Sequence, residues 1–385
     1  MKYNILLVDD MYVNRALIKT VLSNYIDNIN YLEAADGRKA IELINEKSID
    51  LIILDLLLPD VDGYEILNEI KKKETTKNIP VIINSSIQEV ESMQTTLGLG
   101  ALDYFIKPLT VEQMKTIVPI KVRNALLYND QRKLLVKMNE QIKEELRLAS
   151  ILQTSLIPEF GEYSNGKLYG IYKPSKEIGG DIYDCIQVGE SLWFIIADVT
   201  GHGVASAMVS VMIKAAFTNA VRHLGTPKEV LENMNNTFCN MLGEENDILF
   251  SAFVGVIKEG RLYYSNAGHP YPVVLRNDAK KVELLNMDGH VIGFFNEITL
   301  EEKDIEFEKG DCIFCYTDGL FDISSSDDEK DWDYMLNVLK KNRSLIDKEP
   351  KKFLDQILDT VRKTEKDSYK DDITLMLITS DFKEG

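Results

Sequence analysis

The sequence has few cysteines, no long apolar run and a deficit of positive charge. Its 4 cysteines include one C-x-x-C pair, Cys312 and Cys315, but no second pair or histidine pair completes a zinc site. Both cysteines lie in DCIFCY, whose alternation predicts buried thiols in a core strand. The longest apolar candidate, LIILDLLLP, contains Asp55 and falls far short of the roughly 20 residues of a membrane span. The first apolar run is too short for a signal peptide, so we expect a cytoplasmic protein.

The balance of charge excludes a further class of partner. The net charge is -18 and the isoelectric point is about 4.8, which disfavours binding to a nucleic-acid phosphate backbone. The length of 385 residues, 45% of them hydrophobic, predicts two or three domains with real cores. We therefore expect a multidomain protein without a nucleic-acid partner.

The first 120 residues alternate short apolar runs with helical patterns. NILLVDD, LIILDLLLP, IPVIINSS and ALDYFIKP read as strands, and RALIKTVLSNYI has helical spacing. Strands that alternate with helices predict a doubly wound parallel α/β sheet, in which ligands bind at the carboxyl ends of the strands. Five polar residues fall at or near such ends: Asp9, Asp10, Asp55, Ser85 and Lys107.

These residue types suit one kind of chemistry. Three carboxylates repel one another unless a hard cation lies among them, and Mg²⁺ prefers oxygen ligands. A lysine ammonium and a small hydroxyl beside the cation suit an incoming phosphoryl group. Any one of these residues alone would be read as a solvated strand end, but the set predicts a phosphoryl site.

Residues 1–120 resemble a two-component response regulator receiver domain. The resemblance implies that Asp55 accepts a phosphoryl group from a histidine kinase or a phosphotransfer protein. It also implies that Asp9, Asp10 and Asp55, with the backbone carbonyl of Leu57, hold Mg²⁺.

The same resemblance assigns the residues of the switch. Ser85 matches the switch hydroxyl, Tyr104 the aromatic switch position and Lys107 the conserved ammonium. Lys107 precedes Pro108 in a step that is usually cis in this family.

Residues 121–156 form a charged segment, which we interpret as a helical, coiled-coil-like linker. Helical spacing begins near Val111 and contains no glycine, although Pro119 is expected to interrupt or kink it. Apolar residues recur at steps of three and four. This stripe packs either on a neighbouring domain or on the same stripe of a second copy in a parallel dimer, and we favour the dimer. The stripe consists of Leu135, Met138, Ile142, Leu146, Ala149, Leu152 and Leu156.

Residues 157–385 contain many short alternating strands. These are KLYGIYKP, SLWFIIADV, LFSAFVGVI, RLYYSNAG, YPVVLR, KVELL, DCIFCYTDG and ITLMLITS. Helical patterns cover VASAMVSVMIKAAFTNAVRHL, PKEVLENMNNTFCNML, Met335–Lys341 and Lys351–Lys363. Numerous strands with segregated helices predict an α+β fold, a two-sheet sandwich flanked by helices.

Aspartates lie at or near the ends of several predicted strands in this segment. They stand in GGDIYD, ADVTGHG, YTDGL and KDDITL, beside glycine or at a strand boundary. Their similar placement over nearly 200 residues indicates a shared cation cluster, and oxygen ligands favour Mg²⁺ or Mn²⁺ over zinc. Two such ions would activate a water for attack on a phosphoryl group. The acids are Asp181, Asp184, Asp198, Asp318, Asp371 and Asp372.

Other kinds of site fit this segment less well. GHGVAS matches a dinucleotide-binding loop poorly, and no βαβ unit surrounds it. His202 and His269 lack a metal-binding partner histidine, so His269 is read as a turn or substrate-side residue. The absence of a GxSxG motif argues against a serine hydrolase.

The motifs GGDIYD, ADVTGHG, NAGHP, YTDGL and DDITL together resemble the type 2C metal-dependent serine/threonine phosphatases, in particular their RsbU/SpoIIE-like sigma-regulatory branch. The resemblance implies that Asp198 bridges two Mn²⁺ or Mg²⁺ ions with help from the carbonyl of Val199. Asp181 would bind one ion, and Asp318 with the pair Asp371 and Asp372 would bind the other.

The resemblance also gives a reason for the sequence around Asp198. A strand would end on this carboxylate so that it can bridge two cations, and the following glycines would let the backbone crowd the site. Lys173 and Lys176 are the two candidates for holding the substrate phosphate.

We therefore expect a response regulator with a protein phosphatase output. By resemblance, its substrate would be a phosphorylated anti-sigma-factor antagonist of the STAS fold. The alternative is a non-catalytic adaptor that uses the phosphatase fold for binding. The intact set of acids favours the enzyme.

Overall fold

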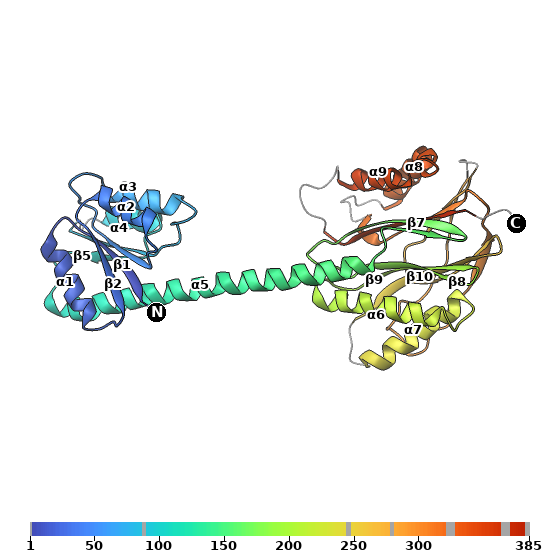
Figure 1. Ribbon diagram of the computed structural model, residues 1–385, viewed down its shortest axis with the longest axis horizontal. Helices are drawn as coiled ribbons and strands as arrows, with labels where there is room; N and C mark the ends of the chain where they lie inside the picture. Colours follow the sequence, from blue (N-terminus) through green and yellow to red (C-terminus); the bar gives the residue numbers. More distant parts are fainter. Residues whose placement is uncertain are drawn as a thin grey trace. The chain divides into compact units, whose positions relative to one another are not determined.

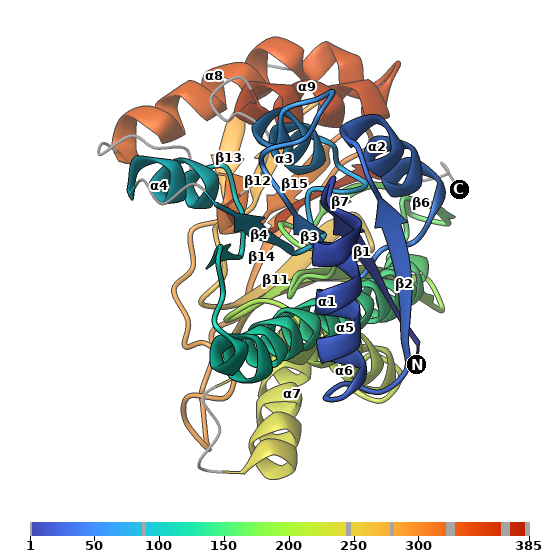
Figure 2. The same ribbon diagram turned by 90° about the vertical axis from the view of Figure 1, so that its left-hand side faces the viewer.

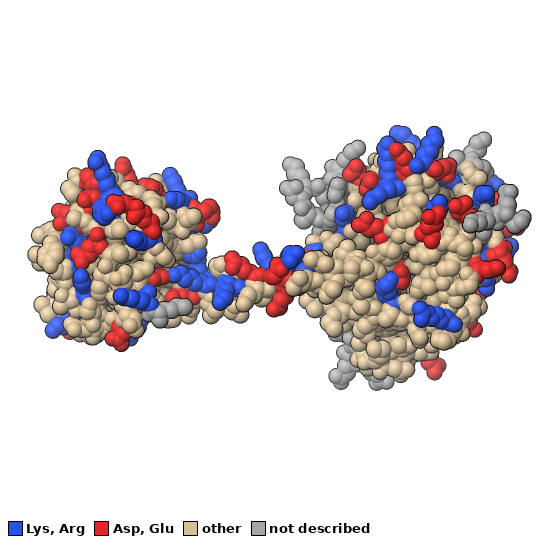
Figure 3. Space-filling model, viewed as in Figure 1, with Lys and Arg blue, Asp and Glu red and all other residues tan. Residues whose placement is uncertain are grey.

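A computed structural model describes residues 2–86, 90–243, 248–277, 281–320, 328–362 and 370–381. The chain divides into two compact units, Met1–Ile142 and Lys143–Gly385 (Figure 1). Acidic and basic side chains are interspersed over much of both surfaces (Figure 3). Within the described residues, none of the helices is long and apolar enough to cross a membrane.

The first unit contains a five-stranded parallel sheet of order β2-β1-β3-β4-β5. Its central strands are short and almost fully buried, which is why they appear in the sequence as unbroken apolar runs. The strands are β1 (Tyr3–Val8), β2 (Ile29–Ala34), β3 (Leu51–Leu54), β4 (Val81–Ser85) and β5 (Asp103–Ile106).

Helices cover both faces of this sheet (Figure 2). One face packs on α2 (Gly37–Glu46) and α3 (Gly63–Lys72), and the other packs on α1 (Tyr12–Ser23) and on the beginning of α5 (Val111–Leu156). The remaining helix, α4, spans Val90–Gly98. The predicted doubly wound fold of the first unit is therefore confirmed.

Helix α5 continues through Pro119. Of the two effects expected at this proline, an interruption is therefore ruled out. Val118 and Val122 are fully buried against the sheet, and this packing holds the helix together where the proline removes one backbone hydrogen bond. Asn129 of the same helix donates to the carbonyl of Asp50 at 3.1 Å, so the attachment to the first unit extends beyond the apolar contact.

The second unit contains two antiparallel sheets. One has the order β14-β11-β10-β9-β8 and the other the order β13-β12-β15-β16-β7-β6. The strands of the first sheet are β8 (Ile182–Val188), β9 (Ser191–Val199), β10 (Phe250–Lys258), β11 (Arg261–Ala267) and β14 (Lys303–Glu306). Those of the second are β6 (Phe160–Tyr163), β7 (Gly166–Lys173), β12 (Val273–Leu275), β13 (Val282–Leu284), β15 (Cys312–Tyr316) and β16 (Ile373–Ser380).

The two sheets pack face to face between helices. Helices α6 (Val204–Ala220) and α7 (Pro227–Leu242) cover the β8–β11 sheet, and α8 (Asp328–Ile346) and α9 (Pro350–Arg362) cover the other (Figure 1). A short 3₁₀ helix, η1 (Asp318–Leu320), follows β15. This arrangement confirms the predicted α+β sandwich.

Local sequence explains several of these features. Helix α7 begins with a capping box between Thr226 and Glu229, with Pro227 in its first turn. Cys312 and Cys315 lie in β15 as free, fully buried thiols, as their alternating sequence predicts.

Candidate functional site

Three carboxylates meet at the carboxyl ends of the strands in the first unit. Asp9 follows β1 and Asp55 follows β3, and both are buried, whereas Asp10 is exposed. One oxygen from each of the three carboxylates lies within 4.8 Å of the others, an arrangement that can hold a metal ion. The structure thus brings together the three acids predicted to bind Mg²⁺.

Lys107 lies among these acids. Its Nζ atom is 2.6 Å from Asp9 Oδ2 and 2.5 Å from Asp55 Oδ2. Burial raises the pKa of Asp55, and the ammonium of Lys107 acts in the opposite direction. The Lys107–Pro108 peptide bond is cis, as expected.

The remaining predicted switch residues occupy neighbouring positions in the sheet. Ser85 ends β4 and is fully buried, and its carbonyl accepts a hydrogen bond from the backbone N–H of Lys107 at 2.9 Å. Tyr104 is buried within β5. The exposed Leu57 follows Asp55, and its backbone N–H donates to Asp55 Oδ1 at 3.1 Å.

In the second unit, Asp181 is the most deeply buried of the predicted acids. Its Oδ2 atom accepts hydrogen bonds from the hydroxyls of Thr317 at 2.7 Å and Thr374 at 2.6 Å. Burial raises its pKa well above the usual range, and the neighbouring charge of Asp198 raises it further. These two threonines, one in YTDGL and one in DDITL, are site residues that the sequence analysis missed.

Asp198 is the penultimate residue of β9 and is only partly exposed. Its pKa is raised to about 7, first by burial and then by the charge of Asp318, with further contributions from Asp371 and Asp372. Asp198, Asp318 and the adjacent pair Asp371 and Asp372 therefore lie close enough to interact electrostatically, although they come from three separate stretches of the sequence.

Asp371 and Asp372, the acid pair after α9, lie in two different environments. Both carboxylate oxygens of Asp372 are occupied: Oδ1 accepts from the N–H and the hydroxyl of Ser175 at 2.7 and 2.9 Å, and Oδ2 accepts from the N–H of Gly180 at 2.7 Å. Asp371 is exposed, as is Asp318 at the start of η1. Asp184, the second acid of GGDIYD, pairs with Lys214 of α6 at 2.5 Å.

The glycines around the acids serve two different purposes. A side chain at Gly319 would meet the backbone oxygen of Asp372 at 2.1 Å, and one at Gly179 would meet Asp372 Oδ2 at the same distance. Gly201 and Gly203 have φ angles of 85° and 97°, but a Cβ at either would meet nothing within 4 Å. The expectation that the glycines after Asp198 permit crowding is therefore wrong, since they permit a left-handed turn.

A cavity of about 530 Å³ opens beside Asp198 and Asp318. Among the described residues that line it, there is no lysine or arginine. His269 is buried at the wall of this cavity, and its Nδ1 atom forms a hydrogen bond with the hydroxyl of Ser251 at 2.8 Å. Burial lowers the pKa of His269 to about 3. An anionic substrate could enter this acidic cavity only together with cations. All-oxygen donors of this kind suit divalent metal ions. Among the described residues, however, the group of acids whose oxygens already lie within 4.8 Å of one another is Asp9, Asp10 and Asp55, and the acids around Asp198 do not meet that spacing.

The two candidate phosphate-binding lysines lie in different places. Lys176 Nζ is 3.1 Å from Nδ1 of His202, in the turn that follows Asp198. Lys173, at the end of β7, lines a separate, smaller cavity together with Glu159 and Lys351. The structure thus places Lys176 nearer to the segment that carries Asp198.

The last turns of α5 are attached to the acid-bearing segment. The side chain of Gln153 is buried, and its Nε2 atom donates to the carbonyl of Gly179 at 2.7 Å and to the hydroxyl of Ser210 in α6 at 2.9 Å. Gly179 stands two residues before Asp181. Sequence reasoning missed this contact, because a glutamine in a charged helix gives no signal of burial.

Comparison with known families gives two matches. The family model of stage II sporulation protein E (SpoIIE) matches residues 189–381, and that of the response regulator receiver domain matches residues 5–119.

Individual proteins resemble separate parts of the chain. Phosphoserine phosphatase RsbP of Bacillus subtilis is 25% identical over 189 residues, which are 48% of this chain and 47% of that protein. Sporulation initiation phosphotransferase F of the same organism is 34% identical over 118 residues, which are 31% of this chain and 92% of that protein. The chain spans about half the length or less of several curated relatives that it matches.

A solved structure supports the fold. The SiaA-PP2C domain of Pseudomonas aeruginosa aligns with a TM-score of 0.55 at 19% identity, over 63% of this chain and 99% of that one.

Proposed function

The chain belongs to the stage II sporulation protein E family and also carries a response regulator receiver domain, and on this premise we propose that it is a response regulator with a metal-dependent protein phosphatase as its output. The observation that carries the proposal is the convergence of carboxylates on Asp198, beside a cavity whose described lining has no lysine or arginine.

The input of the proposed function is phosphorylation of Asp55. A histidine kinase or a phosphotransfer protein donates the phosphoryl group, and a carboxylate oxygen of Asp55 forms the new bond to phosphorus as the histidine nitrogen leaves. Mg²⁺ held by Asp9, Asp10, Asp55 and the Leu57 carbonyl would neutralise charge in this transfer. Lys107, already within ion-pair distance of Asp55, then pairs with the phosphoryl group and, with Ser85 and Tyr104, reports its presence.

The output is hydrolysis of a phosphoserine or phosphothreonine ester. Two Mn²⁺ or Mg²⁺ ions held by Asp181, Asp198, the Val199 carbonyl, Asp318 and Asp371 would supply Lewis-acid activation of water and of the phosphoryl group. By the family resemblance, Asp198 would be a ligand shared by both ions. Thr317 and Thr374 orient the carboxylate of Asp181 by donating to one of its oxygens.

We assign Asp371 and Asp372 different tasks within the predicted ligand pair. Asp372 already accepts three hydrogen bonds, so it holds the Ser175 and Gly180 backbone in place around the site. Both acids raise the pKa of Asp198, but Asp371 is exposed and accepts a hydrogen bond from the N–H of Asp372 at 2.8 Å, which leaves it the more available ligand of the two.

The proposed substrate is a phosphorylated anti-sigma-factor antagonist of the STAS fold. The support is the resemblance of the five motifs to the sigma-regulatory branch and the likeness to RsbP, itself named a phosphoserine phosphatase. Lys176, beside the turn after Asp198, is the proposed contact for the substrate phosphate.

The proposed domains are a receiver at 1–120, a helical linker at 121–156 and a phosphatase domain at 157–385. The linker forms a parallel homodimer through its apolar stripe, of which Leu135, Met138, Ile142 and Leu152 are largely exposed in the single chain. Gln153 connects the end of this linker to the backbone next to Asp181, which gives the helix a route to the catalytic acids.

A hydrolysis assay tests the proposed activity. Turnover of a generic aryl phosphate should require Mn²⁺ or Mg²⁺ and disappear with EDTA. The substitutions Asp198→Ala and Asp318→Ala should each lower kcat by on the order of 10³ or more, because the carboxylates hold the ions that organise the water.

Asp304→Ala provides a matched control. This acid is exposed on β14 and pairs with Arg261 on the surface, so its loss should leave kcat unchanged. Undiminished turnover in both site variants would disprove the two-metal phosphatase. Tight binding of the phosphoprotein without hydrolysis, at any metal concentration, would favour the adaptor instead.

A further inference from the structure

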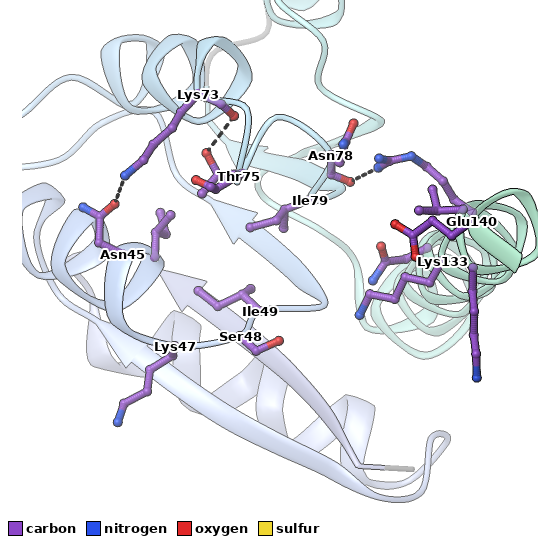
Figure 4. Close-up of a pocket in the computed structure, with 16 residues that line it drawn as sticks. Asn45, Lys47, Ser48, Ile49, Lys73, Thr75, Asn78, Ile79, Lys133 and Glu140 are labelled. Atoms are coloured by element: carbon purple, nitrogen blue, oxygen red, sulfur yellow. Dashed lines mark hydrogen bonds between the residues drawn. The ribbon is translucent and has the colours of Figure 1, made fainter. Parts of the chain in front are cut away.

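The first unit has a cavity at the edge of its sheet opposite the acids of the phosphorylation site. Its volume is about 710 Å³, within the range of roughly 300–1,000 Å³ typical of small-molecule sites. Three segments line it: the end of α2 with the loop to β3, the loop between α3 and β4, and one face of α5 (Figure 4). All of them belong to the first unit.

Helix α5 contributes a continuous face to this cavity. The lining positions follow one another at steps of three, one, three, one and three, which places them on one side of a helix. They are Asn129, Arg132, Lys133, Val136, Lys137 and Glu140. Two of them fix the helix to the opposite wall, since Asn129 donates to the carbonyl of Asp50 and Arg132 donates to the carbonyl of Asn78 at 2.8 Å.

The cavity is strongly basic in a chain whose net charge is -18. Its described lining contains a single acid, Glu140, and five cations: Lys47, Lys73, Arg132, Lys133 and Lys137. Lys133 pairs with Asp50 at 2.5 Å, but among the described residues the other four cations have no carboxylate within ion-pair distance. Lysine and arginine side chains gather on the surface where α5 leaves the first unit (Figure 3).

Neutral partners orient two of these cations without cancelling their charge. Lys73 Nζ donates to the side-chain oxygen of Asn45 at 2.6 Å, and Arg132 uses one nitrogen for the Asn78 carbonyl. The guanidinium of Arg132 keeps further N–H donors in the planar fork that suits phosphate oxygens. Nearby, the pKa of Lys71 is lowered to about 8, chiefly by burial and then by the charge of Arg132.

The floor of the cavity is apolar. Ile44 and Ile49 are buried, and Ile79 and Val136 add further apolar surface. In Figure 4, Ile49 and Ile79 lie between Lys73 with Asn45 on one side and Lys133 of α5 on the other. A ligand that fits such a site has a flat apolar part for the floor and a cluster of negative charge for the rim.

We propose that this cavity binds a phosphorylated small molecule with an aromatic ring system, such as a nucleoside di- or triphosphate. Arg132, Lys73 and Lys137 bind the phosphates, and the isoleucines contact the ring. Lys47, whose side chain points away from the floor in Figure 4, adds positive charge at the rim. An acidic peptide would satisfy the cations but would leave the enclosed apolar floor unfilled, which is why a nucleotide fits better. The bound ligand would link the two loops to α5, independently of the proposed phosphatase activity.

Calorimetric titration of the whole protein with ADP, ATP and pyrophosphate tests the proposal. EDTA in the buffer keeps divalent ions from both carboxylate clusters, so that phosphate binding there does not contribute. We expect saturable binding of ADP or ATP that weakens as salt is added, because the rim is electrostatic. Pyrophosphate should bind at least several-fold more weakly, since it cannot use the floor.

A matched pair of double variants identifies the site. Lys47→Gln with Lys137→Gln removes two cations that make no hydrogen bond or ion pair among the described residues, so the fold should persist, and affinity should fall roughly tenfold. Lys115→Gln with Lys143→Gln removes the same charge from exposed positions of α5 outside the cavity and should have little effect. Equal affinity in both double variants, no saturable nucleotide binding at millimolar concentration, or binding of an oligoglutamate peptide in preference to nucleotide would overturn the proposal.

Discussion

Asp198 makes the stability of the metal-free protein depend on pH. Its pKa in the folded chain is about 7, above the value of 3.8 for an unperturbed aspartic acid. The folded state therefore favours the protonated carboxyl, and ionisation disfavours folding. The metal-free protein should lose stability as the pH rises from about 4 to about 7.

The substitution Asp198→Asn tests this dependence. The amide cannot ionise, so in EDTA at pH 8 the free energy of unfolding of the variant should exceed that of the wild type by on the order of 1–2 kcal/mol after allowance for partial exposure, and the variant should unfold at a higher temperature. At pH 4 the difference should nearly vanish. Thermal unfolding followed by circular dichroism at both pH values measures it. A variant less stable than the wild type at pH 8 would contradict the crowding of like charges around Asp198.

Asp55 and Lys107 allow a second prediction about single residues. Asp55→Asn should abolish labelling by a small-molecule phosphodonor, because an amide does not accept the phosphoryl group. Lys107→Ala should still be labelled, since the ammonium pairs with the phosphate without transferring it, but it should lose the conformational response. Mass spectrometry measures the labelling, and wild-type stoichiometry in Asp55→Asn would show that the acceptor is another residue.

The two groups of acids differ in how far the sequence could predict them. Asp9, Asp10 and Asp55 follow parallel strands, whose carboxyl ends meet at one edge, so their proximity follows from topology. The environment of Asp372 depends instead on Ser175, which is 197 residues away in sequence. No local pattern indicates such a contact, so the division of tasks between Asp371 and Asp372 became visible only in the structure.

Among the secondary-structure elements, those at the edges of the sheets were the hardest to predict. The sequence analysis identified the central strands but missed β2, β6, β8 and β14, each of which lies at the edge of its sheet. Edge strands pair on one side and are often partly exposed, as in the polar KDIE of β14, so they lack a clear apolar run. The predicted bounds of α7, Pro227–Leu242, were correct at both ends, because the capping box of Thr226 and Glu229 marks the start of the helix in the sequence.

Helix α5 carries the prediction about signal transfer. Met138 and Ile142 are both about half exposed, at 48% and 50%, and belong to the proposed dimer stripe. Replacing both with glutamate should place like charges at the seam and separate the helices. Phosphoprotein hydrolysis should then no longer respond to beryllofluoride, a phosphoryl mimic, while turnover of a small aryl phosphate survives.

A control for this experiment lies on the same helix. Asn139→Glu with Gln141→Glu introduces the same two charges at exposed positions outside both the stripe and the cavity lining, and should leave the response intact. A fully responsive Met138→Glu, Ile142→Glu double variant would mean that the seam does not carry the signal and that the receiver masks the phosphatase directly.

At the level of the whole molecule, each unit has hydrophobic clusters of its own. Those of the first unit lie between Ile5 and Leu126, and those of the second between Ile157 and Ile378. Cores built from separate stretches of chain are expected to unfold separately. Differential scanning calorimetry should therefore resolve two transitions.

Core substitutions assign these transitions. Leu67→Ala creates a cavity in the first unit and should lower one transition by roughly 10 °C, for a cost of about 2–5 kcal/mol. Val254→Ala in the second unit should shift only the other. A single transition that moves in both variants would show that the chain unfolds as one cooperative body.

The buried hydrogen bond from Gln153 to the Gly179 carbonyl limits how large any switch through α5 can be. This bond is 2.7 Å long, and a displacement of about 1 Å takes it beyond hydrogen-bond distance, whereas a helix rises about 1.5 Å per residue, so a slide of less than one residue suffices to break it. Leaving the buried carbonyl and amide unsatisfied costs about 1–3 kcal/mol. Through this contact alone, α5 can therefore alter the balance between two states of the catalytic segment by a factor of about 5 to 150. A change of this size grades the activity within a bounded range. An all-or-none response would need a second contact, or a second chain acting in concert.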